Sequence, residues 1–445
     1  MYQGYRFPTC TSPRQRFMQT LNVAALCFLA GWGASLPSFA IAAPETANSL
    51  QLLIVEVIAK HPQLAVQAGA VRAAEAGVEG ARWQFYPTPS ISVESAATTA
   101  GDTTYGGDRQ VAILGLRQPL WNGGRLSANL EKAKATLALN NALLSESRLQ
   151  LTLRVVQSYG DWFAAHEKQK VYATGLGLHQ QMKEMVVRRV QEGLSAPSDL
   201  VLAEERLAVL ESDALAGAIQ KRTSLLKLSQ LAGRSLNEQE LALRPAASGV
   251  PASSLEHLLN QAQETSPALA RYRAIAQTQR SALTERKADQ WPEVYARLER
   301  QFGNFSVSGM APETRAFVGL TSRFGAGLSN QSSIAEAQGQ LDAALAEIDV
   351  QRLGLQEQVM VDHTVLMQSE PRRLALQQGA AKSRLVLQSW DRQFLSGRKT
   401  WQDLMNSARE NIQLEAQIAD LEASRLVAFW RLMALTDSAQ LPHLP

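Results

Sequence analysis

The chain has 445 residues, with 44 Lys and Arg against 41 Asp and Glu. This length is enough for two or three globular domains or for one long, rod-like fold. Arg6, Arg14 and Arg16 lie in the first 42 residues, which hold no acid, so the remainder carries 41 charges of each sign. A balanced chain offers nucleic acid no net electrostatic attraction, and we exclude nucleic acid as a partner.

Residues 1–42 have the organisation of a secretory signal peptide. The basic stretch precedes an apolar run over residues 21–34, and Ala40-Ile41-Ala42 is a small-residue cleavage site. Both cysteines, Cys10 and Cys27, lie within this segment. We therefore expect a mature chain without disulfides, thiol chemistry or cysteine metal ligands.

A lipid anchor on Cys27 is not expected, because Leu26 stands where a lipidation signal requires a small residue. After the signal no run of 18 apolar residues occurs, so the sequence predicts no transmembrane helix.

The rest of the chain is duplicated. Pro62-Gln63-Leu64-Ala65 returns at an offset of 205 as Pro267-Ala268-Leu269-Ala270, and Pro87 returns as Pro292. Further along, the offset is 204 and relates two sets of residues: Arg188, Gly193, Asp199 and Leu200, and Arg392, Gly397, Asp403 and Leu404. A repeat of roughly 200 residues is far longer than solenoid units of roughly 20–50 residues. The fold should therefore consist of two similar halves.

The first repeat is expected over residues 43–233, with a helix, a β-hairpin at about 88–119 and long helices at about 121–232. Residues 120–196 contain no proline and carry a seven-residue ladder: Leu130, Leu137, Leu144 and Leu151. A helix of ~70 residues would be ~100 Å long. That length suits a coiled coil or an α-helical tube.

Small and polar residues lie between the ladder leucines: Ala133, Asn140 and Ser147. A two-stranded coiled coil needs apolar residues in both rows. One large and one small row suits helices laid side by side in a wall with one wetted face. Periodicity alone favours an ordinary antiparallel coiled coil equally.

Residues 234–254, which contain Pro245 and Pro251, are expected to link the halves. The second repeat follows over 255–436, with a hairpin at about 293–324 and long helices at about 329–436. Pro371 is expected to kink the long helix or to start a new segment. Residues 437–445 form a tail.

The hairpin segments favour the wall over the coiled coil. Each strand is short, weakly alternating and bordered by aromatic residues, which is the pattern of transmembrane β-strands. Aromatic residues fall at the expected strand ends, where an interfacial belt requires them: Trp83, Phe85, Tyr86, Trp121, Trp291, Phe302 and Phe324. Outer-membrane barrels begin at eight strands, so four strands per chain require several copies.

Three local motifs, in this order and duplicated, carry a family resemblance. They are Gln118-Pro119-Leu120-Trp121-Asn122-Gly123-Gly124, Arg189-Val190-Gln191-Glu192-Gly193 and Phe394-Leu395-Ser396-Gly397. Over residues 50–436 the chain resembles the TolC-like outer membrane efflux proteins. The resemblance implies a mainly α fold with a small β part. In that fold three chains form a twelve-stranded barrel that continues into a periplasmic tunnel of twelve helices.

The resemblance makes residues 118–124 a junction where Pro119 ends the strand and Gly123 and Gly124 allow a sharp bend. In the second repeat Gly325 and Gly327 replace the glycine pair, and Arg323 replaces the proline. A dinucleotide-binding reading of these glycines fails, because Asn330 occupies the place of the third glycine.

The same resemblance places the closing end of the tunnel at the turns after Gly193 and Gly397. Three copies of Asp403 would form an anionic ring at a constriction. Asn406 stands where the family often has a second acid, and Phe394 where it often has a tyrosine. Lys399 and Asp199 match a pair that latches neighbouring helices.

Helix capping is the alternative reading for Asp199 and Asp403, because acids favour the first turn of a helix. It is preferred for Asp199 and equally weighted for Asp403.

Catalysis finds no support in the sequence. The six histidines are scattered singly, without metal-ligand spacing: His61, His166, His179, His257, His363 and His443. No phosphate-binding loop or nucleophile elbow is present. We expect neither an enzyme nor a bound cofactor or metal.

The expected function is a passive outer-membrane exit duct of a Gram-negative cell. Its implied partners are two further copies, outer-membrane lipid, a periplasmic membrane-fusion adaptor, and an inner-membrane ABC exporter or proton-driven pump. The turns and the missing lipidation signal favour type I protein secretion over multidrug efflux. The alternative of another class is a soluble periplasmic coiled-coil scaffold or adaptor.

Overall fold

The computed structural model describes residues 49–97, 103–242, 253–322 and 329–436. The expected signal peptide, residues 243–252 of the linker, the C-terminal tail, and Gly325 and Gly327 at the second junction lie outside the described residues.

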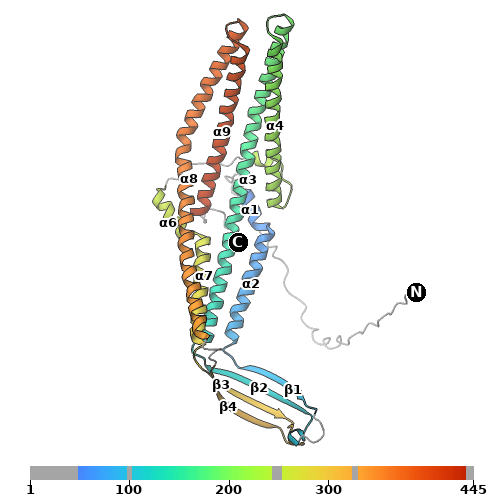
Figure 1. The fold of residues 1–445 in the computed structure, drawn as a ribbon, viewed down its shortest axis with the longest axis vertical. Helices are drawn as coiled ribbons and strands as arrows, with labels where there is room; N and C mark the ends of the chain where they lie inside the picture. The colour runs from blue at the N-terminus through green and yellow to red at the C-terminus, as the bar shows by residue number, and fades with distance from the viewer. Residues whose placement is uncertain (1–48, 98–102, 243–252, 323–328, 437–445) are drawn as a thin grey trace, which may run out of the picture. The chain divides into compact units, whose positions relative to one another are not determined.

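Both repeats run through the same order of elements (Figure 1). The first comprises α1 (Ser49–Lys60), α2 (Pro62–Trp83), β1 (Thr88–Ser95), the 3₁₀ turn η1 (Thr103–Tyr105), β2 (Gln110–Trp121), α3 (Arg125–Gln191), α4 (Pro197–Ala232) and the short α5 (Glu238–Ala242). The second comprises α6 (Leu255–Thr265), α7 (Pro267–Ala288), β3 (Glu293–Phe302), β4 (Glu313–Thr321), α8 (Asn330–Leu395) and α9 (Trp401–Thr436). The predicted duplication is confirmed.

The repeated Pro-x-Leu-Ala motif is a helix start. Pro62 and Pro267 occupy the first position of α2 and α7, where a missing N–H breaks no helical hydrogen bond. The preceding residues cap these helices. His61 accepts a hydrogen bond from the N–H of Gln63, and Ser266 accepts one from the N–H of Leu269.

Two helices dominate the fold: α3 has 67 residues and α8 has 66. At 1.5 Å per residue each is about 100 Å long. The predicted new segment at Pro371 is wrong, because α8 continues through it. Both Pro371 and Met367, whose carbonyl loses its helical donor, are exposed, so water can satisfy that carbonyl. No helix in the described ranges is both long and apolar enough to cross a membrane.

Four helices lie side by side beyond the middle of α3, in the order α4, α3, α9 and α8 (Figure 1). Nearer the strands the order is α2, α3, α7 and α8. Helices α3 and α8 belong to both groups of four. In the group farther from the strands, α4 is the outer helix on one side and α8 is the outer helix on the other.

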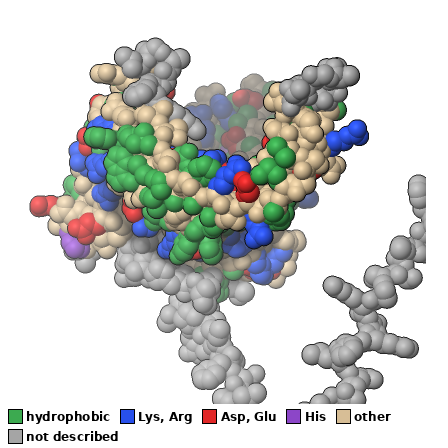
Figure 2. Space-filling model, turned by 90° about the horizontal axis from the view of Figure 1, so that it is seen from below, with side chains coloured by type: hydrophobic (Ala, Val, Ile, Leu, Met, Phe, Trp, Pro, Cys, Tyr) green, Lys and Arg blue, Asp and Glu red, His purple; other side chains and the backbone are tan. Residues whose placement is uncertain are grey.

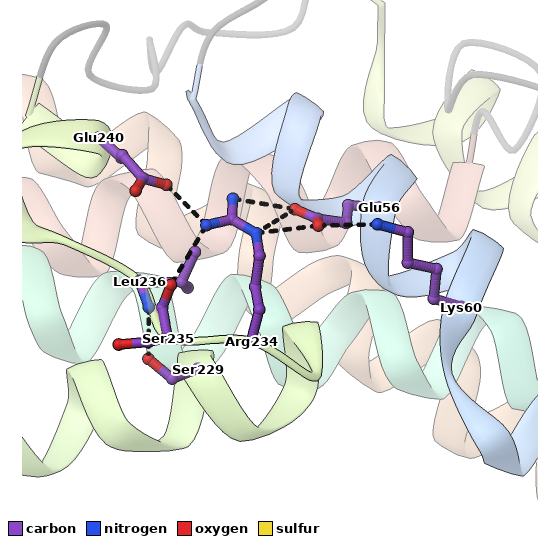
Figure 3. Close-up of polar contacts among 7 residues, drawn as sticks. All are labelled: Glu56, Lys60, Ser229, Arg234, Ser235, Leu236 and Glu240. Atoms are coloured by element: carbon purple, nitrogen blue, oxygen red, sulfur yellow. Dashed lines mark hydrogen bonds and ion pairs between the residues drawn. The ribbon is translucent and has the colours of Figure 1, made fainter.

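A core lies where α1, α3, α4, α5 and α9 meet. Its fully buried members include Ile54 of α1, Tyr159 and Trp162 of α3, and Leu228 of α4. Beside it, Arg234 donates to Glu56 over 2.9 Å and to Glu240 over 2.9 Å (Figure 3). These bonds tie the end of α4 and the start of α5 to α1.

The four strands form one antiparallel sheet in the order β1-β2-β3-β4. The pairing of β2 with β3, for example Leu116 with Leu298, joins the two repeats in a single sheet. In the described residues the outer edges of β1 and β4 have no strand partner.

Candidate functional site: an apolar sheet face and two hairpin turns

The register sorts the strand residues into two faces, because paired residues and every second residue share a face. On one face, Ile91 pairs with Leu114, Leu116 with Leu298, and Ala296 with Val318. The apolar members of this face, called the apolar face below, are Pro89, Ile91, Val93, Ala112, Leu114, Leu116, Val294, Ala296, Leu298, Phe302, Ala316, Val318 and Leu320.

The apolar face is open to solvent in the single chain. Ile91 is 76% exposed and Val318 is 77% exposed. Seen from the sheet end, Figure 2 shows hydrophobic side chains gathered in broad patches with charged ones beside them. Monomeric soluble proteins rarely leave a contiguous apolar surface of this kind uncovered.

The opposite face is mainly polar, and its arginines are paired. Arg117 lies 3.1 Å from Glu293, and its guanidinium carbon is 3.9 Å from the ring centre of Tyr295. Arg297 lies 3.1 Å from Glu299. The sheet is thus apolar on one side and charged but neutralised on the other.

Aromatic side chains lie at the ends of the strands nearest the helices. The rings of Trp121 and Trp291 meet edge to face at 6.1 Å, and Trp83 and Tyr86 lie 5.2 Å apart. All four side chains are exposed. At the loop end, Phe302 is the last residue of β3, whereas Phe324 lies outside the described residues.

The first strand-to-helix junction differs from expectation in one respect. Strand β2 does not end at Pro119 but continues to Trp121, with an irregular register between these two residues. Proline cannot donate to the ladder, which accounts for the irregularity.

The bend itself lies at Gly123 and Gly124, which have φ angles of +62° and +89°. A Cβ on Gly123 would lie 2.5 Å from the Cβ of Trp291. This glycine therefore serves both the backbone bend and the close approach of the second repeat.

The two hairpin turns have the same hydrogen bonds. Gly193 and Gly397 have φ angles of +72° and +74°. The N–H of Gly193 donates to the carbonyl of Val190, and that of Leu194 donates to Arg189. The second turn repeats both bonds 204 residues later. This is the glycine-terminated helix end that spares other residues a left-handed conformation.

The two turns pack together through an aromatic cluster that the sequence analysis did not predict. Phe394 of α8 and Trp401 of α9 are each 3% exposed, with ring centres 5.7 Å apart. Met182 and Val186 of α3 pack in the same cluster. The guanidinium carbon of Arg189 lies 4.8 Å from the ring centre of Phe394. Aromatic residues on both sides of Gly397 were the available signal.

Asp403 caps helix α9. Its carboxylate accepts a hydrogen bond from the N–H of Thr400, and its own N–H donates to the Thr400 hydroxyl oxygen. Lys399 Nζ lies 3.7 Å from the same carboxylate and 4.2 Å from the ring centre of Trp390. The Thr400 hydrogen bonds, with a smaller contribution from Lys399, lower the pKa of Asp403.

Capping and a role in the pore are compatible for Asp403, because its side chain is 40% exposed. Asn406, one turn later, is exposed as well. Asp199 is partly exposed in the first turn of α4 and has no cation within ion-pair distance in the described part of the chain. Lys399 pairs with Asp403 in this chain, so the Lys399–Asp199 latch stays a prediction.

The described residues include no group of three or more His, Cys, Asp or Glu side chains that could hold a metal ion. The features of this site are an apolar sheet face and two hairpin turns.

The model of the family described as outer membrane efflux protein matches residues 53–234. The first repeat is thus similar to this family over nearly its whole length. Protein CyaE of Bordetella pertussis is 27% identical to the chain over 177 residues, which are 39% of this chain and 37% of that protein. The match thus spans little more than a third of the curated relative.

Solved structures extend the likeness to both repeats. The outer-membrane channel OprN has a TM-score of 0.76 at 18% identity, over 88% of this chain and 91% of its own. The outer membrane protein VceC of Vibrio cholerae has a TM-score of 0.76 at 14% identity, over 87% and 96%. The open MtrE channel of Neisseria gonorrhoeae has a TM-score of 0.70 at 15% identity, over 87% and 89%. The whole described chain has the fold of outer membrane efflux proteins.

Proposed function

We propose that the chain is one subunit of an outer-membrane exit duct, which passes cargo delivered by an inner-membrane transporter through a periplasmic adaptor. The observation that carries this proposal is the exposed apolar face of the four-stranded sheet. An apolar surface of this kind is stable when something apolar shields it from water. The acyl chains of membrane lipid have the required chemistry.

The size of the apolar face fits a membrane. On β3 it runs from Val294 to Phe302, nine residues that span about 26–27 Å at 3.2–3.4 Å per residue. A transmembrane strand tilted by about 45° has about 9–11 residues within the hydrocarbon core. The exposed aromatic residues at the helix end lie where an interfacial girdle belongs.

The two sheet edges, which have no strand partner among the described residues, support assembly of several copies. The free edge of β1 differs from that of β4, and a contact between unlike edges is head-to-tail and can close a ring. The outer helices also carry exposed apolar rows. On α4 they are Val201, Leu215, Ile219 and Leu226, and on α8 they are Leu353, Met360, Met367 and Leu374 at seven-residue spacing. Three copies, as the family resemblance implies, would supply twelve strands and a helical tunnel.

The hairpin turns at the far ends of the helices would close this tunnel on the periplasmic side. The proposed partners are a membrane-fusion adaptor and an inner-membrane ABC exporter. The absent lipidation signal and the sequences of the turns support type I protein secretion. The alternative is the duct of a multidrug efflux pump. A soluble coiled-coil scaffold is disfavoured, because such a protein does not require an apolar sheet face.

A matched pair of substitutions on β1 tests the proposal. Ile91 lies on the apolar face and Ser92, its neighbour, lies on the polar face; both are exposed. A lysine at the middle of a lipid-facing strand costs about 2–4 kcal/mol. We expect Ile91→Lys to reduce the protein recovered from the outer membrane and its single-channel conductance, and Ser92→Lys to change neither. Equal recovery of the two variants would contradict a lipid-covered apolar face.

A further inference from the structure

Arg300 is the only charged residue on the apolar face in the described strands. It pairs with Leu114 of β2 and with Thr314 of β4. Along β3 its neighbours on the same face are Leu298 and Phe302. The side chain is exposed, so a full positive charge stands on a surface that is otherwise apolar.

Among the arginines of the described strands, Arg300 is also the one that has no carboxylate within ion-pair distance. The other three arginines of the described strands lie on the polar face and each has a glutamate: Arg117 with Glu293, Arg297 with Glu299, and Arg315 with Glu313. No acidic side chain of the described residues lies within ion-pair distance of Arg300. Within the described part of the chain the charge of Arg300 is therefore not neutralised.

The side chain of Arg300 leans toward the loop end of the sheet. Its guanidinium carbon lies 5.5 Å from the ring centre of Phe302, the last residue of β3. Long cationic side chains on lipid-facing surfaces extend in this way toward the membrane surface, where the charge is solvated. The orientation of the Arg300 side chain therefore indicates that an anion would bind on the side of the loops.

Arg300 lies near the loop end of the apolar face. On β3 only Phe302 of this face lies nearer the loops, and on β4 the residue of this face nearest the loops is Thr314. The charge of Arg300 is therefore close to the end of the apolar face that is farther from the helices.

We propose that Arg300 binds the phosphate of a lipid headgroup in the leaflet on the loop side of the sheet. A guanidinium presents a rigid fork of donors that matches phosphate oxygens. The paired Thr314 offers a hydroxyl donor, and Leu114, Leu298 and Phe302 offer the acyl chain an apolar bed. This site rests on the proposed function, because it requires that lipid cover the apolar face.

The experiment uses the full mature protein reconstituted in phosphatidylcholine vesicles with or without phosphatidylglycerol. Retained lipid is counted by native mass spectrometry after mild extraction, and thermal stability is measured in parallel. A charged hydrogen-bonded contact changes affinity by about tenfold or more. We expect Arg300→Gln to lower phosphatidylglycerol retention by about that factor and Arg300→Lys to restore part of it. Arg315→Gln, on the opposite face, should leave retention unchanged.

Three results would overturn the site. Undiminished phosphatidylglycerol retention by Arg300→Gln shows that another group binds the headgroup. Inorganic phosphate that stabilises the wild type as much as phosphatidylglycerol does, in an Arg300-dependent way, shows that the ligand is a free anion. Failure of the wild type to enter either kind of vesicle would contradict the proposed function and this site together. That outcome differs from the first two because no lipid of either kind is retained.

Discussion

The guanidinium of Arg189, near the end of α3, lies 4.8 Å from the ring centre of Phe394, at the end of α8. This contact joins the two helical hairpins at their turns. It is reinforced by Trp401, which packs against Phe394 in a shared apolar cluster. The ends of the hairpins are thus held to one another within one chain by aromatic packing and a cation–π contact, each of which is stronger when desolvated.

Removal of the Phe394 ring should open the periplasmic end. Phe394→Ala deletes a ring that is 3% exposed, and such a deletion costs about 3–5 kcal/mol. We expect a higher leak of large antibiotics into cells and longer open times in planar bilayers. The control is Leu395→Ala, because Leu395 is 60% exposed and should contribute little to the cluster. Wild-type leak in both variants would show that the cluster does not restrain the turns.

The charge of Asp403 should set the ion preference of the channel. Asp403→Asn keeps an oxygen that can cap α9 but removes the negative charge, so it should lower cation selectivity without a large loss of stability. Asn406→Asp should raise selectivity by adding a second ring of charge. Reversal potentials in a salt gradient measure both effects.

The pH dependence follows from the lowered pKa of Asp403. The carboxylate stays charged above its ordinary pKa of 3.8, and selectivity should fall only when the pH drops through the still lower folded value. Selectivity that already changes between pH 7 and pH 5 would point to another group.

Lys399 and Asp199 should act as a latch only when several copies are assembled. Within one chain Lys399 pairs with Asp403 at 3.7 Å, and Asp199 has no such partner in the described residues. Replacement of both, by Lys399→Gln with Asp199→Asn, should raise the leak of large solutes. An unchanged leak would remove the pair from the latch and leave Asp199 as a first-turn residue of α4.

The junction glycines separate two kinds of strain. Gly123→Ala places a Cβ 2.5 Å from that of Trp291 in addition to straining a positive φ, whereas Gly124 has open space around its Cβ position. The left-handed conformation alone costs about 1–2 kcal/mol. We expect Gly124→Ala to lower thermal stability by that amount and Gly123→Ala by distinctly more. Equal losses of thermal stability in the two variants would show that the Trp291 side chain moves aside at little energetic cost.

The bridge between Arg234 and Glu56 should stabilise the chain in a pH-dependent way. Hydrogen bonds from Arg234 lower the pKa of Glu56 below its ordinary value of 4.5, so the stabilisation is complete above that value and is lost as the pH falls through the folded pKa. Because Arg234 is 44% exposed, Arg234→Gln should cost about 1 kcal/mol or less at pH 7. The melting-temperature difference from wild type should shrink below pH 4.5, whereas Arg82→Gln at an exposed helical pair should show little difference at any pH.

Local signals in the sequence were sufficient for much of the fold. Pro62 and Pro267 start helices because their missing N–H is harmless there. The turns at Gly193 and Gly397 were predicted from the family resemblance, and the positive φ of both glycines explains them. The seven-residue ladder predicted the long helix α3. Each of these features depends on a few neighbouring residues. Because the chain is duplicated, each has a counterpart in the other repeat.

Contacts between distant segments could not be predicted in the same way. The packing of Phe394 on Trp401 under Arg189 depends on how two hairpins meet, and the pairing of β2 with β3 depends on how two repeats meet. A new segment at Pro371 was wrongly expected, because water can satisfy the exposed carbonyl of Met367 and the helix continues. The position of Arg300 on the apolar face became visible only with the register of the strands.

The central claim is tested most directly by fractionating cells that express the full chain, including the expected signal peptide, and measuring the detergent-corrected mass of the protein. We predict a protein extracted only from the outer membrane, with the mass of three chains. A monomer or dimer released with the periplasmic fraction would contradict the duct and favour the soluble scaffold.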